Sequence, residues 1–278
     1  AVTCVRQAGL FAYTGQYAAA HQTGERALNL YRRAGDKGGE AQALRELGFL
    51  HWAASDHGAA LQYGRAALQV HRQLGNVAGE ATALHNLAEI YRSLGSPKQA
   101  MQWYEQALSL HWAQRNRPAE GLTLYGMAHA LRQVGQHDRA EHHYQQALAH
   151  FQAAGDRLMT SRVHHSLAIL QWEVRATDQA LDHMNQALSI SREIGYGPGI
   201  AHGLIALSYL HAQKNEIDLA KERIREALTW LGLMEDQIGL GEARNRLQAL
   251  EEAAPHVMEP PTALGWFKAH VSVAEGKV

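Results

Sequence analysis

Apolar residues recur along this chain at the spacing of one face of an α-helix. A clear example is Leu84, Leu87, Ala88 and Tyr91, which stand at positions i, i+3, i+4 and i+7. The turn residues Gly95, Ser96 and Pro97 follow, and a second apolar face then begins at Ala100. Ser96 is expected to cap the second helix, with Pro97 in its first turn. The pattern predicts two consecutive helices joined by a short turn.

The same two-helix pattern repeats every 40 residues without insertion. Alanine occupies one column of the repeat at six successive positions, and a second column seven residues later is also alanine throughout. These columns are Ala20, Ala60, Ala100, Ala140, Ala180, Ala220 and Ala27, Ala67, Ala107, Ala147, Ala187, Ala227. A period in this range is typical of proteins built by stacking identical helical units. The sequence therefore predicts an all-α solenoid of antiparallel helix pairs.

The columns resemble the tetratricopeptide repeat (TPR), which combines a large residue, Leu, a small residue and aromatic positions at fixed spacing. Leu84, Leu87, Ala88, Tyr91, Ala100, Tyr104 and Ala107 match that spacing. The resemblance implies a right-handed TPR superhelix. The period of 40 is longer than the commoner 34. Gly24 and Gly64 replace an aromatic of the second helix, which predicts looser packing in those repeats.

The predicted array covers residues 1–254 and contains about six and a half helix pairs. Its first pair is truncated, which fits a fragment of a longer protein, and residues 237–253 form a capping helix. Arg244 and Gln248 stand in columns that are apolar elsewhere, as expected of a face turned to solvent. Residues 255–278 contain three prolines and form a tail outside the repeats.

Composition excludes several classes of function. The formal charge is -1, which argues against a broad nucleic-acid-binding face. A single cysteine excludes an internal disulfide framework, and no apolar stretch is long enough for a membrane span. We expect a cytoplasmic protein that contacts neither nucleic acid nor membrane.

No catalytic motif is present, and we expect no enzyme activity and no cofactor. Glu89 near His85 and His129 is the best candidate for an acid–base pair, and a weak one. Histidines such as His142, His143 and His164 suggest a metal site. However, adjacent histidines on a helix point in different directions, so we predict no metal site.

The first helices of the pairs carry the predicted binding residues. In the TPR family the inner surface formed by these helices is the usual ligand groove. By the column of the repeat, the resemblance places the following residues there: Arg45, Trp52, His85, Asn86, Glu89, Arg92, Tyr125, His129, Arg132, Arg162, His165, Trp172 and Tyr209. Aromatic residues with arginines are typical of binding hot spots, and arginine pairs with carboxylates. The alternative is that the tryptophans pack between repeats and that each arginine pairs with a neighbouring glutamate.

The predicted function is a non-enzymatic module that binds a protein or an acidic peptide. The segment from Gly79 to Gly95 resembles the C-terminal sensor repeats of bacterial regulators of the STAND class, which carry an ATPase switch. Similar arrays occur in Pins-type adaptors and kinesin light chains. The alternative function is a sensor whose groove binds a metabolite or signal peptide and changes curvature.

Overall fold

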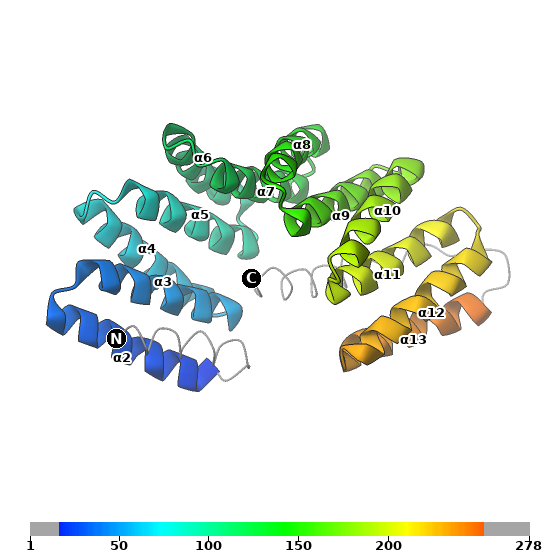
Figure 1. Ribbon diagram of the computed structural model, residues 1–278, viewed down its shortest axis with the longest axis horizontal. Coiled ribbons are helices and arrows are strands. Elements are labelled where there is room, and N and C mark those ends of the chain that lie inside the picture. The colour runs from blue at the N-terminus through cyan, green and yellow to red at the C-terminus, as the bar shows by residue number, and fades with distance from the viewer. Residues whose placement is uncertain (1–16, 253–278) are drawn as a thin grey trace. The chain divides into compact units, whose positions relative to one another are not determined.

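The computed structural model describes residues 17–252, and every regular element in that range is an α-helix (Figure 1). The helices are α2 (Tyr17–Ala34), α3 (Lys37–Ala53), α4 (His57–Gln73), α5 (Val77–Ser93), α6 (Pro97–Ala113), α7 (Arg117–Gln133), α8 (His137–Ala154), α9 (Arg157–Glu173), α10 (Thr177–Glu193), α11 (Gly197–Gln213), α12 (Ile217–Leu233) and α13 (Gln237–Glu252). Consecutive helices pack against each other as antiparallel pairs from α2 to α7 and again from α8 to α13. The all-α fold class and the helix-pair solenoid are thereby confirmed.

The 40-residue period follows from the length of the helices and turns. A typical helix here has 17 residues, and a three-residue turn separates it from the next, so each helix starts 20 residues after the one before. Two such steps make one repeat. The predicted capping helix is α13, and Arg244 and Gln248 on it are exposed. The predicted start of the array and the tail at 255–278 lie outside the described residues.

Each turn uses one residue in the left-handed region of the backbone. Gly75 has φ 63°, and its N–H donates to the carbonyl oxygen of Arg72 at 3.1 Å. The N–H of Asn76 donates to the carbonyl of His71 at 3.0 Å, which completes a Schellman motif. The side chain of Asn76 then accepts from the N–H of Gly79 at 2.9 Å and caps the next helix. Asn76 thus completes the motif that ends α4 and also caps the start of α5.

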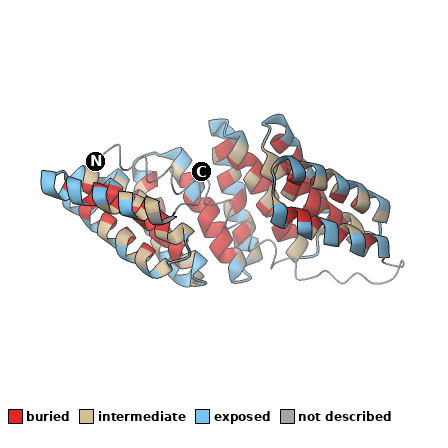
Figure 2. Ribbon diagram, turned by 90° about the horizontal axis from the view of Figure 1, so that it is seen from below, coloured by how far each residue is buried: buried red, intermediate tan, exposed pale blue. Residues whose placement is uncertain are grey.

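The apolar columns that recur in each repeat form the core of the protein. All six alanines of the first column are fully buried, as are Leu47, Leu87 and Leu167. Figure 2 shows buried residues on the faces that helices turn to their neighbours and exposed residues at the turns. Small residues in these columns let neighbouring helices approach closely.

The expectation of loose packing at Gly24 and Gly64 is wrong. A Cβ at Gly24 would lie 2.8 Å from Cδ2 of Leu47, and one at Gly64 would lie 2.9 Å from Cδ2 of Leu87. The leucine of the following first helix therefore fills the space that an aromatic would otherwise occupy. The missing side chain is compensated by its neighbour.

The chain divides into two compact units, and the division falls between Gln136 and His137. The first described unit contains α2 to α7, and the second contains α8 to α13. Each has its own buried clusters, such as Ala27, Leu44 and Leu47 in the first unit and Leu204, Leu207 and Ile224 in the second. The sites below are accordingly described one unit at a time.

Candidate functional site

The predicted binding residues lie on the first helices of both units. In the first unit these helices are α3, α5 and α7, and in the second unit they are α9 and α11. The "first-helix face" denotes, in the first unit, the surface that carries Arg45, Trp52, His85, Asn86, Glu89, Arg92, Tyr125, His129 and Arg132.

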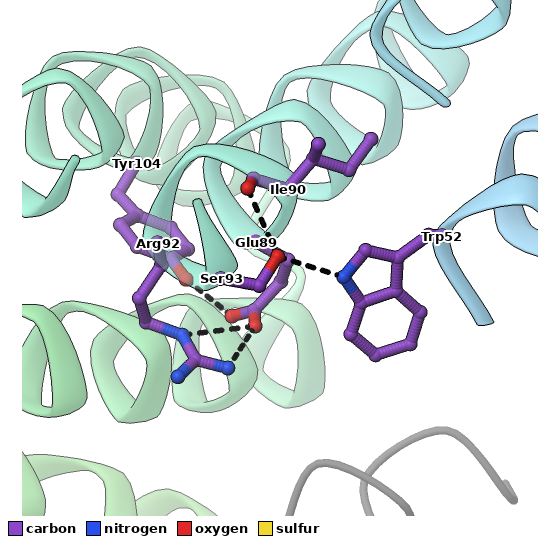
Figure 3. A network of polar contacts seen from close by, with 6 residues as sticks. All are labelled: Trp52, Glu89, Ile90, Arg92, Ser93 and Tyr104. Carbon is purple, nitrogen blue, oxygen red and sulfur yellow. Dashed lines mark hydrogen bonds and ion pairs between the residues drawn. The ribbon is translucent and has the colours of Figure 1, made fainter. Parts of the chain in front are cut away.

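Glu89 on α5 is the centre of a polar cluster (Figure 3). Arg92 stands three residues later, and one turn of helix brings its guanidinium to the carboxylate. Nε and Nη2 of Arg92 donate to Oε2 of Glu89 at 3.1 and 2.7 Å. Tyr104 on α6, which is fully buried, donates its hydroxyl to Oε1 of Glu89. The arrangement joins α5 to α6 through a carboxylate with both oxygens engaged.

The charges in this cluster stabilise one another. Burial alone would raise the pKa of Glu89, but the charge of Arg92, the nearby His85 and the bond from Tyr104 hold that pKa below its usual value. Burial and the Glu89 charge raise the pKa of Tyr104 well above its usual value. Burial also lowers the pKa of His85. Glu89 is therefore ionised at neutral pH and held in an ion pair, an arrangement that does not favour proton transfer to a substrate.

A glycine on the neighbouring first helix makes room for the cluster. A Cβ at Gly126 on α7 would lie 2.6 Å from the hydroxyl oxygen of Tyr104 and 2.7 Å from Oε1 of Glu89. Both distances are shorter than any real Cβ contact with such atoms. Gly126 is therefore required by the close approach of α7 to the Glu89 cluster.

Hydrogen bonds also link the first helices directly. Nε1 of Trp52 on α3 donates to Oγ of Ser93 on α5 at 2.9 Å, and that hydroxyl donates to the carbonyl of Ile90 (Figure 3). On the next pair, Nδ1 of His85 lies 3.2 Å from Oγ1 of Thr123 on α7. These contacts hold α3, α5 and α7 in fixed register.

The remaining residues of this face differ in exposure. Arg45 is exposed and pairs with Glu46 at 2.7 Å. Trp52 is half-buried and packs against exposed Phe49, with ring centroids 5.8 Å apart. Asn86 and Arg132 are half-buried.

Tyr125 and His129 are buried, with their rings in an edge-on contact at 4.5 Å. These two residues therefore belong mainly to the packing of α7. Of the three residues that the sequence suggested as an acid–base set, Glu89 and His85 act on each other's charge, and His129 packs against Tyr125.

In the second unit the predicted aromatics meet. Trp172 on α9 and Tyr209 on α11 lie 6.0 Å apart between ring centroids. Arg246 on α13 lies 4.0 Å above the Tyr209 ring, a cation–π contact. Arg162 and His165 are half-buried on α9, nearer the start of that helix.

Sequence reasoning missed Tyr104, Ser93 and Arg246 as partners of the predicted residues. The repeat spacing predicts Tyr104 as a packing residue, and its ring is buried as expected, but its hydroxyl belongs to the polar cluster. Arg246 stands in the same column of the repeat as Ala206, so its larger size is the only indication in the sequence that its role differs. The long side chain is accommodated against α11, where it lies over the Tyr209 ring and Nη2 donates to the carbonyl oxygen of Ser208 at 3.4 Å.

Two further features were sought among the described residues, a cluster of several metal ligands and a membrane span. Among them no group of three or more His, Cys, Asp or Glu side chains is arranged to hold a metal ion. None of the helices between residues 17 and 252 is long and apolar enough to span a membrane.

Solved structures resemble this chain throughout most of its length. BtubC from P. vanneervenii matches with a TM-score of 0.63 and 18% identity, over 87% of this chain and 94% of its own. A Rap protein complexed with Competence and Sporulation Factor matches with a TM-score of 0.68 and 15% identity, over 86% of this chain and 66% of its own. A STAND protein with a tetratricopeptide repeat sensor from Pyrococcus horikoshii matches with a TM-score of 0.68 and 14% identity, over 86% of this chain and 38% of its own. These likenesses concern the fold.

No curated protein matches the sequence significantly. The model of the tetratricopeptide repeat family, in contrast, matches residues 39–111 and 120–193. Those segments make up more than half of the chain and coincide with α3 to α6 and α7 to α10. The columns, the helix pairs and this match agree, and the chain belongs to the tetratricopeptide repeat family.

Proposed function

We propose that this chain is a non-enzymatic module that binds a protein or peptide on its first-helix face. The TPR fold is a protein-interaction scaffold. The observation that carries the proposal is the pair Phe49 and Trp52, with exposed Arg45 on the same helix. Aromatic area beside an arginine is the composition of binding hot spots.

The structure refines which arginines are suited to a ligand. The side chain of Arg92 is only 11% exposed and its fork is occupied by Glu89, so Arg92 positions the cluster and is a poor ligand contact. Arg45 is 46% exposed and pairs with half-buried Glu46, its neighbour in the chain, an interaction of small net free energy near the surface. An acidic ligand group therefore competes more easily for Arg45 than for Arg92.

The hydrogen bonds of Trp52 and His85 support pre-organisation of the face. Because α3, α5 and α7 are tied by side-chain contacts, little conformational entropy is lost in ordering them when a partner binds. The proposed ligand is an extended or helical segment with acidic side chains and at least one apolar anchor.

We further propose that the module is the sensor or regulatory arm of a larger signalling protein that acts in the cytoplasm. The neighbours support this proposal, since one is a STAND protein with a TPR sensor and another is a Rap protein with a bound factor. The chain spans about 38% of the STAND protein's length, which is consistent with one arm of a larger protein. The single cysteine is compatible with a reducing compartment.

The test is selection of peptides from an unbiased display library, followed by calorimetry with the selected peptides. Arg45→Glu and Trp52→Leu are expected to weaken binding at least tenfold each. Arg33→Glu is the matched control because Arg33 is exposed on α2, outside the face. Circular dichroism of each variant confirms the fold. Equal affinity of wild type and the Arg45→Glu/Trp52→Leu double variant would contradict the assignment of this face.

The alternative is a small-ligand sensor, and one feature of the second unit favours it. A hollow of about 390 Å³ lies among α8, α9 and α10 and is lined by Gln152, Thr160, His164, Gln186 and Ser189 among others. Calorimetry against a panel of metabolites separates this function from peptide binding, because only peptide binding depends on Trp52.

A further inference from the structure

A histidine occupies a core column of the second unit that is leucine in most other repeats. His164 on α9 is 5% exposed and stands in register with four buried leucines. They are Leu44, Leu84, Leu124 and Leu204. A polar ring at a buried position that is leucine in four other repeats costs desolvation free energy. Repeat packing therefore does not explain His164.

The histidine meets a second histidine from the other helix of its pair. Nδ1 of His164 lies 3.1 Å from Nδ1 of His183 on α10, and the ring centroids are 5.4 Å apart. In the absence of an ion, the Nδ1–H of one ring donates to the bare Nδ1 of the other. The two atoms that face each other are the same atom type, and each is a nitrogen that binds transition metals in its deprotonated state.

We propose that His164 and His183 chelate a late first-row transition-metal ion, Ni²⁺, Cu²⁺ or Zn²⁺, through their two Nδ1 atoms. The pair supplies two ligands and solvent supplies the others. The sequence does not indicate that these two histidines meet, because they are 19 positions apart on different helices.

The distance between the two atoms fits this chemistry. Ligand nitrogens bind such ions at about 2.0–2.1 Å, so two neighbouring ligands are about 2.9–3.4 Å apart for angles of about 90–110°. The observed 3.1 Å lies within that range. The separation of the two nitrogens is therefore compatible with one shared ion.

The surroundings favour a cation and give it access. Glu141 on α8 and Asp182 on α10 act on His183 with negative charge. Burial, with the nearby His183, lowers the pKa of His164 to about 4, so its ring is neutral at pH 7 and keeps a lone pair for a metal. His164 also lines the hollow among α8, α9 and α10, which brings solvent to one side of its ring.

The ligand set predicts which ions bind. Imidazole nitrogen suits Ni²⁺, Cu²⁺ and Zn²⁺, whereas Mg²⁺ and Ca²⁺ require oxygen ligands. Because the two histidines come from the two helices of one pair, the ion links α9 to α10. Binding is therefore expected to stabilise the second unit against heat.

The experiment is calorimetric titration of the whole chain, without a histidine tag, with NiCl₂, ZnCl₂ and MgCl₂. We expect one site for Ni²⁺ and Zn²⁺ and no binding of Mg²⁺. His164→Leu and His183→Gln should each weaken that site at least tenfold. His142→Gln is the matched control, since His142 is an exposed histidine on α8 of the same unit.

Two further measurements keep the outcome decisive. Ring ¹⁵N chemical shifts should change at Nδ1 of both histidines, and Zn²⁺ should raise the Tm of the wild type and not that of His164→Leu. His164→Leu is expected to fold, because leucine fills this column in four other repeats. Equal affinity of wild type and both test variants, or loss of the site only in His142→Gln, would overturn the proposal.

Discussion

The Glu89 cluster makes Gly126→Ala a sensitive test of the packing between α5, α6 and α7. The new methyl group would start 2.6 Å from the Tyr104 hydroxyl and 2.7 Å from Oε1 of Glu89. The Tyr104 ring is fully buried and another of its atoms, Cε1, lies 2.7 Å away, so the ring cannot swing aside. The expected response is that the carboxylate moves and the bond from Tyr104 to Glu89 is lost.

The magnitude follows from two opposing contributions. Losing a hydrogen bond to a charged group costs about 1.5–3 kcal/mol. Replacing a helical glycine by alanine contributes about 1 kcal/mol of stability in the other direction. Gly126→Ala should therefore lower the free energy of unfolding by about 0.5–2 kcal/mol, the difference of those two figures.

Gly58→Ala is the matched control because it makes the same chemical change in the same unit. A Cβ at Gly58 would meet only Oδ1 of Asp56, at an ordinary 3.6 Å. Its helix α4 should therefore gain up to about 1 kcal/mol from the substitution. The two variants thus differ in the sign of their effect.

The assay is urea unfolding followed by circular dichroism at 222 nm, with midpoints compared among wild type and both variants. Midpoints are used because stacked repeats need not unfold in a single step. The reasoning is refuted if Gly126→Ala unfolds at the wild-type midpoint or above it, as Gly58→Ala is expected to do.

Two other predictions follow from the structure. The pKa of His164 is about 4 in the folded chain and about 6.5 in the unfolded chain. Between these values the unfolded chain binds a proton that the folded chain does not. The free energy of unfolding therefore falls by up to about 3 kcal/mol as the pH drops from about 6.5 to 4. Urea midpoints measured across that pH window should decline less in His164→Leu than in wild type, and parallel declines would contradict the assigned pKa. Arg115 has φ 55° in the turn before α7, so Arg115→Gly should raise the Tm by relieving a strain of about 1 kcal/mol, whereas Gly155→Ala, at φ 69°, should lower it by a similar amount. Calorimetric scans that show the same sign for both would exclude the αL geometry of these turns.

The helix pairs could be predicted because the signal repeats. A single window such as Leu84 to Tyr91 is compatible with many helices, but six copies in register define both the helix faces and the turns. Packing at Gly24 was predicted wrongly because column matching counts a residue only by its own size. Leu47, from the next helix, fills the site, and its reach depends on the distance between helices.

The candidate site could also be predicted only in part from the sequence. The arginines and aromatics of the first-helix face could be selected by column, but their roles could not. Arg45 and Arg92 look alike in the sequence, yet Arg45 is exposed and Arg92 is half-buried against the carboxylate of Glu89. The difference depends on Tyr104, which comes from another helix and was counted as a packing residue.

The sequence by itself determined the period, the two-helix repeat and the family, because each depends on short-range spacing that recurs along the chain. The tertiary structure alone decided which polar groups meet: Glu89 with Tyr104, Trp52 with Ser93, and His164 with His183. Such contacts join residues on different helices, and a hydrogen bond or a metal chelate requires atoms within a few tenths of an ångström of a set distance. That precision arises from helix packing: the absence of a Cβ at Gly126 leaves the space that the Tyr104 hydroxyl and the Glu89 carboxylate occupy.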